Sequence, residues 1–192
     1  MKKHLKYSAL FLVGFLLAAC SSPTDDTVQT PASYYDLKGF IAHQITELKK
    51  RKPLVTKQMS VGETSESTQT TDIDWGKELD LFAQADLNKK AYLLSYDTAN
   101  PDPNTLVYTL KKGEKLPVKL LKITLDATHQ KPARVEAQLS EDNQLYDSAK
   151  TLTLTATMRP EGIWMVKTYE ISGFQHLALT DKKAFRVTGT IR

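Results

Sequence analysis

Few side chains in this sequence have a type and spacing that could do chemistry. Cys20 is the only cysteine among the 192 residues, which excludes an intrachain disulfide and a zinc site built from several thiolates. The four histidines, His4, His43, His129 and His176, stand far apart, and no H-E-x-x-H or H-x-H pattern occurs. Neither G-x-S-x-G nor a glycine-rich phosphate loop is present. The sequence therefore predicts no metal site and no cofactor, and we expect a protein that is not an enzyme.

The polar candidates that remain have ordinary structural explanations. His43 lies off the apolar stripe of a predicted helix, where we expect it in solvent. His129 lies in a turn and His176 follows a predicted bend, so either could face a cleft. Two pairs of acids fall at a helix start and in a turn, where capping explains them better than acid–base catalysis: Asp72/Asp74 and Glu141–Asp142.

The first twenty residues have the pattern of an export signal. Lys2, Lys3 and Lys6 precede the apolar run 7–19, whose thirteen residues span roughly 20 Å of helix and are too short to cross a bilayer. The run ends in Leu17-Ala18-Ala19-Cys20, which resembles the lipobox of bacterial lipoproteins. An ordinary secretory peptide with a chance cysteine is the alternative, but the only cysteine of the chain falls at the motif position.

The resemblance implies that residues 1–19 are removed and that Cys20 carries acyl chains such as palmitate. Two or three acyl chains make a near-permanent membrane anchor. Ser21 after the cysteine then implies transport to the outer membrane, facing the periplasm or the cell surface. Asp25 and Asp26 resemble acidic pairs that export some lipoproteins to the surface, or they serve only to solubilise the linker. Residues 20–32 lack aromatic side chains and contain two prolines, so we expect a flexible tether before one domain at 33–192.

The basic charge of the chain lies mostly in the signal. There are 26 Lys and Arg against 22 Asp and Glu, a net charge of +4. Removing Lys2, Lys3 and Lys6 leaves 26 − 3 = 23 basic residues, or +1, so nucleic-acid binding has no support. The run 49–52 remains basic; we interpret it as a helix end that suits the helix dipole, with anionic headgroups as the alternative.

Two helices are predicted before residue 90. Leu37, Ile41 and Leu48 belong to an apolar stripe that predicts a helix over 34–51, with Ser33 and Asp36 as a capping box and Pro53 as the stop. A hairpin is expected next, with one arm at 55–61 and a return at 70–73. The second helix begins after Asp74 or Asp72, has Trp75, Leu79, Phe82 and Ala83 on its apolar stripe, and ends around 88–90.

From residue 91 onward the apolar period is two. The turn residues between the runs favour short connections and antiparallel neighbours, and no βαβ spacing occurs. We therefore predict an α+β fold, two amphipathic helices on a curved antiparallel meander, with a bend at Gly173. The predicted strands are 91–96, 105–111, 116–126, 133–139, 144–158, 163–173 and 184–192.

Aromatic residues supply the remaining hints of a binding surface. Tyr34 and Tyr35 could lie at a membrane interface, although packing against the sheet is the favoured interpretation. Trp75 is expected in the core. Trp164 is out of phase with Ile163 and Met165, so we expect it on the outer face of the sheet, where it could contact a partner.

Two functions fit these features. The first is a non-enzymatic accessory or binding module of the cell envelope, and the second is a carrier of an apolar ligand in a concave sheet. The mature chain also resembles small envelope lipoproteins of Gram-negative bacteria, through the sequences at 35–40 (YDLKGF) and 169–174 (YEISGF). That resemblance implies no particular function and adds no site.

Overall fold

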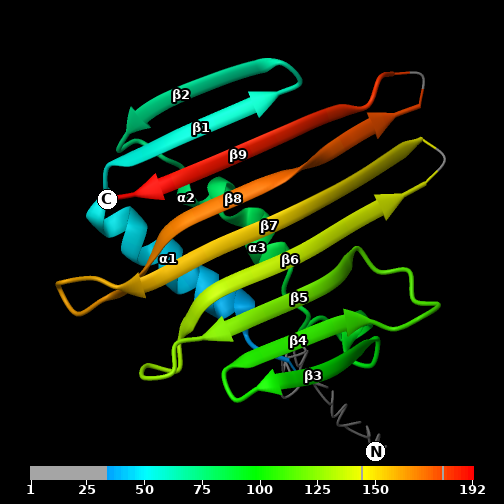
Figure 1. Ribbon diagram of the computed structural model, residues 1–192, viewed down its shortest axis with the longest axis horizontal. Coiled ribbons are helices and arrows are strands. Elements are labelled where there is room, and N and C mark those ends of the chain that lie inside the picture. Colours follow the sequence, from blue (N-terminus) through cyan, green and yellow to red (C-terminus); the bar gives the residue numbers. More distant parts are fainter. Residues whose placement is uncertain (1–33, 144, 179) are drawn as a thin grey trace, which may run out of the picture. The chain divides into compact units, whose positions relative to one another are not determined.

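Seven of the nine strands follow one another both along the chain and across a single antiparallel sheet (Figure 1). The computed structural model describes residues 34–143, 145–178 and 180–192. The signal at 1–19, Cys20 and the tether at 20–32 lie outside these residues. By its contacts, Ala32–Arg192 forms a compact unit of its own. The predicted combination of an antiparallel sheet with helices is confirmed.

The strand order is β2-β1-β9-β8-β7-β6-β5-β4-β3. The run from β3 to β9 is the predicted meander, and the hairpin of β1 and β2 joins it because β1 pairs with β9, with Val55 opposite Ile191. The strands are β1 (Val55–Val61), β2 (Thr64–Thr70), β3 (Tyr96–Asp102), β4 (Thr105–Leu110), β5 (Val118–Leu125), β6 (Pro132–Asp142), β7 (Tyr146–Met158), β8 (Trp164–Leu177) and β9 (Lys183–Ile191).

The helices all lie behind the sheet in the view of Figure 1. They are α1 (Leu37–Arg51), α2 (Trp75–Glu78) and α3 (Asp80–Gln84), followed by the 3₁₀ turn η1 (Lys90–Tyr92). Within the described part of the chain, no helix is both long and apolar enough to cross a membrane.

Two predicted helix boundaries are corrected. The first helix begins at Leu37 rather than at 34, because Asp36 is its N-cap and accepts a hydrogen bond from the Gly39 N–H at 2.8 Å. The second predicted helix is two short helices that break at Leu79, and Asp74 caps the first of them. The second of them ends at Gln84 and not around 88–90. Leu79 still points into the core, so the apolar spacing that predicted one helix is also compatible with two short ones.

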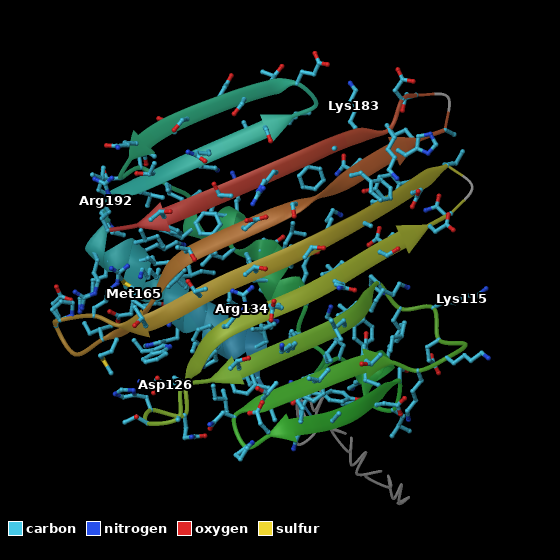
Figure 2. All side chains as sticks on the ribbon, viewed as in Figure 1. Lys115, Asp126, Arg134, Met165, Lys183 and Arg192 are labelled. Carbon is cyan, nitrogen blue, oxygen red and sulfur yellow. The ribbon has the colours of Figure 1, made fainter. Side chains whose placement is uncertain are left out.

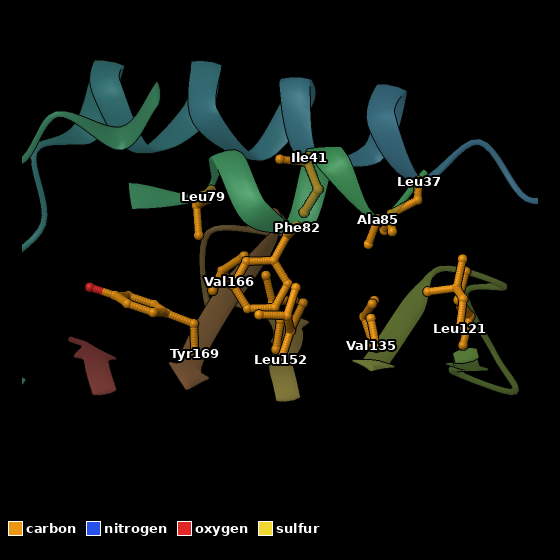
Figure 3. Packing of buried hydrophobic residues seen from close by; sticks show 14 of the residues in the cluster. Leu37, Ile41, Leu79, Phe82, Ala85, Leu121, Val135, Leu152, Val166 and Tyr169 are labelled. Atoms are coloured by element: carbon orange, nitrogen blue, oxygen red, sulfur yellow. The ribbon is translucent and has the colours of Figure 1, made fainter. Parts of the chain in front are cut away.

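The space between the helices and the sheet is filled by aliphatic and aromatic side chains (Figure 3). Phe82 of α3 lies between Ile41 of α1 and the sheet residues Leu152 and Val166, and all four are fully buried. Burying each such side chain stabilises the fold by about 1.5–3 kcal/mol. The helices are therefore held mainly by this apolar face, as the predicted stripes require.

Two strand predictions fail at the edges of the sheet. The predicted strand 91–96 is instead the end of η1 followed by a turn at 93–95, and β3 begins only at Tyr96. The second arm of the hairpin is the polar stretch 64–70, not the return at 70–73. Both β2 and β3 are edge strands with mostly exposed side chains, so neither needs the apolar alternation by which a strand is predicted.

Candidate functional site

A solvent-open cleft with aromatic walls lies beside the N-terminal half of α1. It encloses about 470 Å³, and we call it the aromatic cleft. Apolar side chains from the helix and from the starts of β6 and β8 form most of its wall, with two cationic or titratable groups and one carboxylate at its rim. Its lining residues are Tyr35, Asp36, Phe40, His43, Gln44, Lys131, Pro132 and Trp164.

Trp164 lies on the helix-covered face, which corrects the prediction that it faces outward. Its indole N–H donates to the Pro132 carbonyl at 2.9 Å, and the residue is 5% exposed. The cause is a β-bulge: the register between β7 and β8 shifts, so Lys167 is an extra residue on β8. Before the bulge along the chain, Trp164 and Val166 therefore point toward the helices. Without the extra residue, alternation from Tyr169 would have turned Met165 and Lys167 toward the helices instead.

A buried glutamine fixes this end of β8 to α1. The Gln44 side-chain N–H₂ donates to the Trp164 carbonyl at 3.1 Å, and its oxygen accepts the Val166 N–H at 2.8 Å. Gln44 is fully buried. Since β9 pairs with β8 only from Thr168 onward, the amide takes the place of a neighbouring strand. This polar bridge keeps the wall of the aromatic cleft in place.

Two of the histidines come together around Trp164. His43 is exposed, as predicted, and lines the cleft. The His129 ring packs on the indole with the ring centroids 5.3 Å apart, and its Nδ1 lies 2.7 Å from a carboxylate oxygen of Asp126. His176 lies near the far end of β8 and takes no part. Within the described residues, no group of three His, Cys, Asp or Glu could hold a metal ion.

Hydrogen bonds and burial shift the pKa of two groups in this region. The backbone N–H of His129 donates to Asp126 and lowers the pKa of that carboxyl, and the His129 side chain lowers it further. Burial raises the pKa of Tyr35 to about 12, with smaller contributions from Asp36 and Tyr108, so the phenol is neutral at any physiological pH. The arrangement presents an aromatic surface with mixed charges at its rim.

The first described residues are clamped onto the domain. Asn88 accepts a hydrogen bond from the Tyr34 N–H at 3.1 Å and donates to the carbonyls of Tyr34 and Tyr35 at 3.2 and 3.1 Å. The Tyr34 ring is 8% exposed and makes edge contacts with Tyr96 and Tyr108. The packing interpretation of Tyr34 is therefore confirmed.

The basic run and the acid pairs serve as secondary-structure ends. Lys49, Lys50 and Arg51 form the last turn of α1, where cations suit the helix dipole, and Arg51 pairs with Glu47 at 3.2 Å. The pair Glu141–Asp142 ends β6. Asp72 follows β2, and Asp74 caps α2, where the Lys77 backbone N–H is the main cause of a lowered pKa.

The opposite face of the sheet is polar. Thr155 and Thr168 share a hydrogen bond at 2.6 Å, and Arg134 projects beside them near the middle of the sheet (Figure 2). Arg134 and Lys122 both pair with Glu136, at 3.0 and 3.7 Å. The threonine-rich outer face follows the predicted alternation of 151–158, and its charges are largely paired.

No protein family, curated protein or solved structure in the comparisons matches this chain. Cys20, the predicted lipidation site, lies outside the described residues. Sequence reasoning missed Gln44, whose place on the apolar face of α1 was the available signal, and it missed the packing of His129 against Trp164, for which the sequence holds no signal.

Proposed function

We propose that the chain is an envelope lipoprotein, anchored by acyl chains on Cys20, whose folded part is a non-enzymatic accessory or binding module. The observation that carries the proposal is Leu17-Ala18-Ala19-Cys20, with the only thiol of the chain, fourteen residues before the clamped Tyr34. Because acyl chains hold a protein at the bilayer without spanning it, this proposal needs no membrane helix.

The folded part is well suited to present a surface from such an anchor. The clamp at Asn88 fixes the point at which the chain enters the domain, so the domain cannot fray from its tethered end. The aromatic cleft is then the candidate contact site, because its apolar wall of Phe40 and Trp164 could receive an apolar or aromatic side chain of an envelope partner. Gln44 gives that wall a fixed geometry.

The anchor is tested by Cys20→Ala in a Gram-negative host grown with labelled palmitate. We expect the wild-type chain to take up label and to stay in the membrane fraction through a high-salt wash. The variant should take up none and should be found unprocessed or in the soluble fraction. Label and membrane extraction that are unchanged in Cys20→Ala would refute the anchor.

The contact site is tested by placing a photo-crosslinking amino acid at His43 in intact cells. The proposal expects a crosslinked protein from position 43 and none from position 153, a half-buried threonine on the opposite face of the sheet. Crosslinked proteins from position 153 and none from position 43 would contradict the aromatic cleft as the contact site and would indicate the outer face of the sheet.

A carrier of an apolar ligand remains the second candidate, and the aromatic cleft is the observation in its favour. On the helix-covered face Phe82 and Leu152 occupy the space that a ligand in a concave, curved sheet would need. The cleft of about 470 Å³ is open and could take one apolar group. Native mass spectrometry of the protein purified from its host decides the matter, since a carrier retains lipid that Trp164→Ala loses.

A further inference from the structure

One large apolar side chain near the clamped end is left almost wholly in water. Leu94 is 85% exposed, more than any other large hydrophobic residue of the described chain. It follows η1 and the half-buried Leu93. Exposed single leucines are common on protein surfaces, so its exposure alone identifies nothing. Its neighbours are what distinguish it.

Lysines lie on the segment that leads to Leu94 and at the strand end beside it. Lys89 and Lys90 are exposed at the start of η1, and the Lys111 ammonium donates to the Leu94 carbonyl at 2.8 Å. Burial lowers the pKa of Lys89, Asp86 opposes that shift, and the charge of Lys38 adds to it. We call these five residues the basic end: Lys38, Lys89, Lys90, Leu94 and Lys111.

The acid that acts on Lys89 is buried and already accepts backbone hydrogen bonds. Asp86 is 4% exposed, and its two oxygens accept the backbone N–H groups of Lys38 and Asn88 at 3.1 and 2.9 Å. Glu114 lies in the turn that follows β4, where its backbone N–H donates to the Lys111 carbonyl at 3.2 Å. The basic end carries four lysines, and a surface of one sign attracts a partner of the opposite sign.

The basic end is also the end at which the chain from Cys20 enters. The Tyr34 hydroxyl donates to the Leu93 carbonyl at 2.9 Å and lies 3.3 Å from that of Tyr92, so the first described residue is bonded to the segment that carries Leu94. Tyr34 lies fourteen positions after Cys20, a length of chain that reaches at most about 50 Å. An anchor at Cys20 therefore holds this end within reach of the bilayer.

We propose that the basic end contacts a bilayer surface that carries anionic phospholipid. The lysine ammonium groups bind lipid phosphates while Leu94 enters the interfacial layer between them. The inference deepens the proposed function, because the anchor supplies its setting. It also separates two basic clusters: the run Lys49–Lys52 lies at the other end of α1, which is roughly 22 Å long, and is not the lipid contact.

The contact need not be strong. Each lysine near an anionic surface raises the affinity about five-fold. An anchored domain has a high effective concentration at the bilayer, so a weak contact is enough to orient it. The aromatic cleft, which begins beside the clamp at Tyr35, would then lie close to the membrane.

Vesicle sedimentation tests the contact without any acyl anchor. The probe is the chain from residue 20 with Cys20→Ser; it keeps the whole core, which lies within the compact unit Ala32–Arg192. We expect binding to vesicles of phosphatidylglycerol and phosphatidylcholine that is at least about ten-fold tighter than to phosphatidylcholine alone. Equal partitioning into both kinds of vesicle would overturn the proposal.

Two matched double variants locate the contact. Lys89→Glu with Lys90→Glu should weaken binding by about thirty-fold or more. Lys49→Glu with Lys50→Glu makes the same change of charge on exposed residues at the far end of α1 and should weaken it less than about three-fold. Leu94→Asp should also weaken binding. An equal loss from both double variants would show a non-specific charge effect and overturn the proposal.

A second readout uses the Cys20 thiol itself. Coupling Cys20 to a maleimide lipid tethers the chain to vesicles, and hydrogen exchange should then slow at the amides of 89–95 and not at 49–52. Slower exchange at other amides, with no change at 89–95, would contradict the contact. Neither experiment depends on acylation in cells, so a failure of the palmitate test and a failure of this contact are separate results.

Discussion

Gln44 is the polar side chain whose loss should destabilise the fold most. Its amide is fully buried and serves two backbone groups of β8, the Trp164 carbonyl and the Val166 N–H. In Gln44→Leu both groups lose their partner, and β9 pairs with β8 only from Thr168 onward. A buried group left unsatisfied costs about 1–3 kcal/mol, so we expect a loss of about 2–5 kcal/mol in the free energy of unfolding.

Urea unfolding measures this loss as a lower midpoint at an unchanged slope. The matched control is Thr46→Ala, an exposed position on the same helix whose hydroxyl bonds only to the Ala42 carbonyl, and it should stay within about 0.5 kcal/mol of wild type. Gln44→Glu keeps an acceptor for Val166 but has no donor for Trp164 when ionised, so it should also destabilise. A Gln44→Leu protein within about 1 kcal/mol of wild type would refute the strand-replacement role.

Two further changes test the packing and the helix start. Gly189→Ala should lower the free energy of unfolding by about 1–3 kcal/mol, because the added methyl group collides with the Tyr169 ring that crosses Gly189. In a background of Tyr169→Leu the same substitution should cost less. A cost of Gly189→Ala that is equal in both backgrounds would contradict this contact. Asp74 has a lowered pKa in the folded protein, so its stabilisation is present above the usual aspartate pKa and is lost as the pH falls through the folded value. Asp74→Asn can still cap the helix but does not ionise, so its melting temperature should fall less steeply than that of wild type as the pH is lowered. An equally steep fall in both proteins would contradict a contribution of this cap to acid sensitivity.

The meander could be predicted because its central strands have one buried face. In β7, Leu152 and Leu154 are buried between threonines of the outer face, and this alternation is visible in the sequence. The antiparallel order follows from the short turns. The edge strands escaped prediction for the opposite reason. In the sheet β2 pairs only with β1, and almost all of its side chains lie in solvent, so polar residues suffice there.

The face of Trp164 could not be predicted, because one extra residue in β8 reverses the alternation. Sequence spacing counts residues and cannot show which of them is left out of the ladder. The bulge at Lys167 is visible only when β8 is aligned with β7. The aromatic cleft depends on that reversal, so the site escaped prediction together with the bulge.

The clamp and the basic end depend on contacts between distant parts of the chain. Tyr34 meets Asn88 and Leu93 across more than fifty positions, and Lys111 reaches Leu94 from the end of β4. The sequence shows the lysines and the leucine but not their meeting. The basic run at 49–52 was conspicuous because it is contiguous, although the fold places it away from the clamp.

The proposed anchor is tested most directly by the mass of the N-terminal peptide of the protein extracted from its host membrane. The account predicts a chain that begins at Cys20, with a mass increased by a diacylglyceryl group on the sulfur and an acyl chain on the amine. A mature chain that begins at another residue, or one in which Cys20 is a free thiol, would contradict the account.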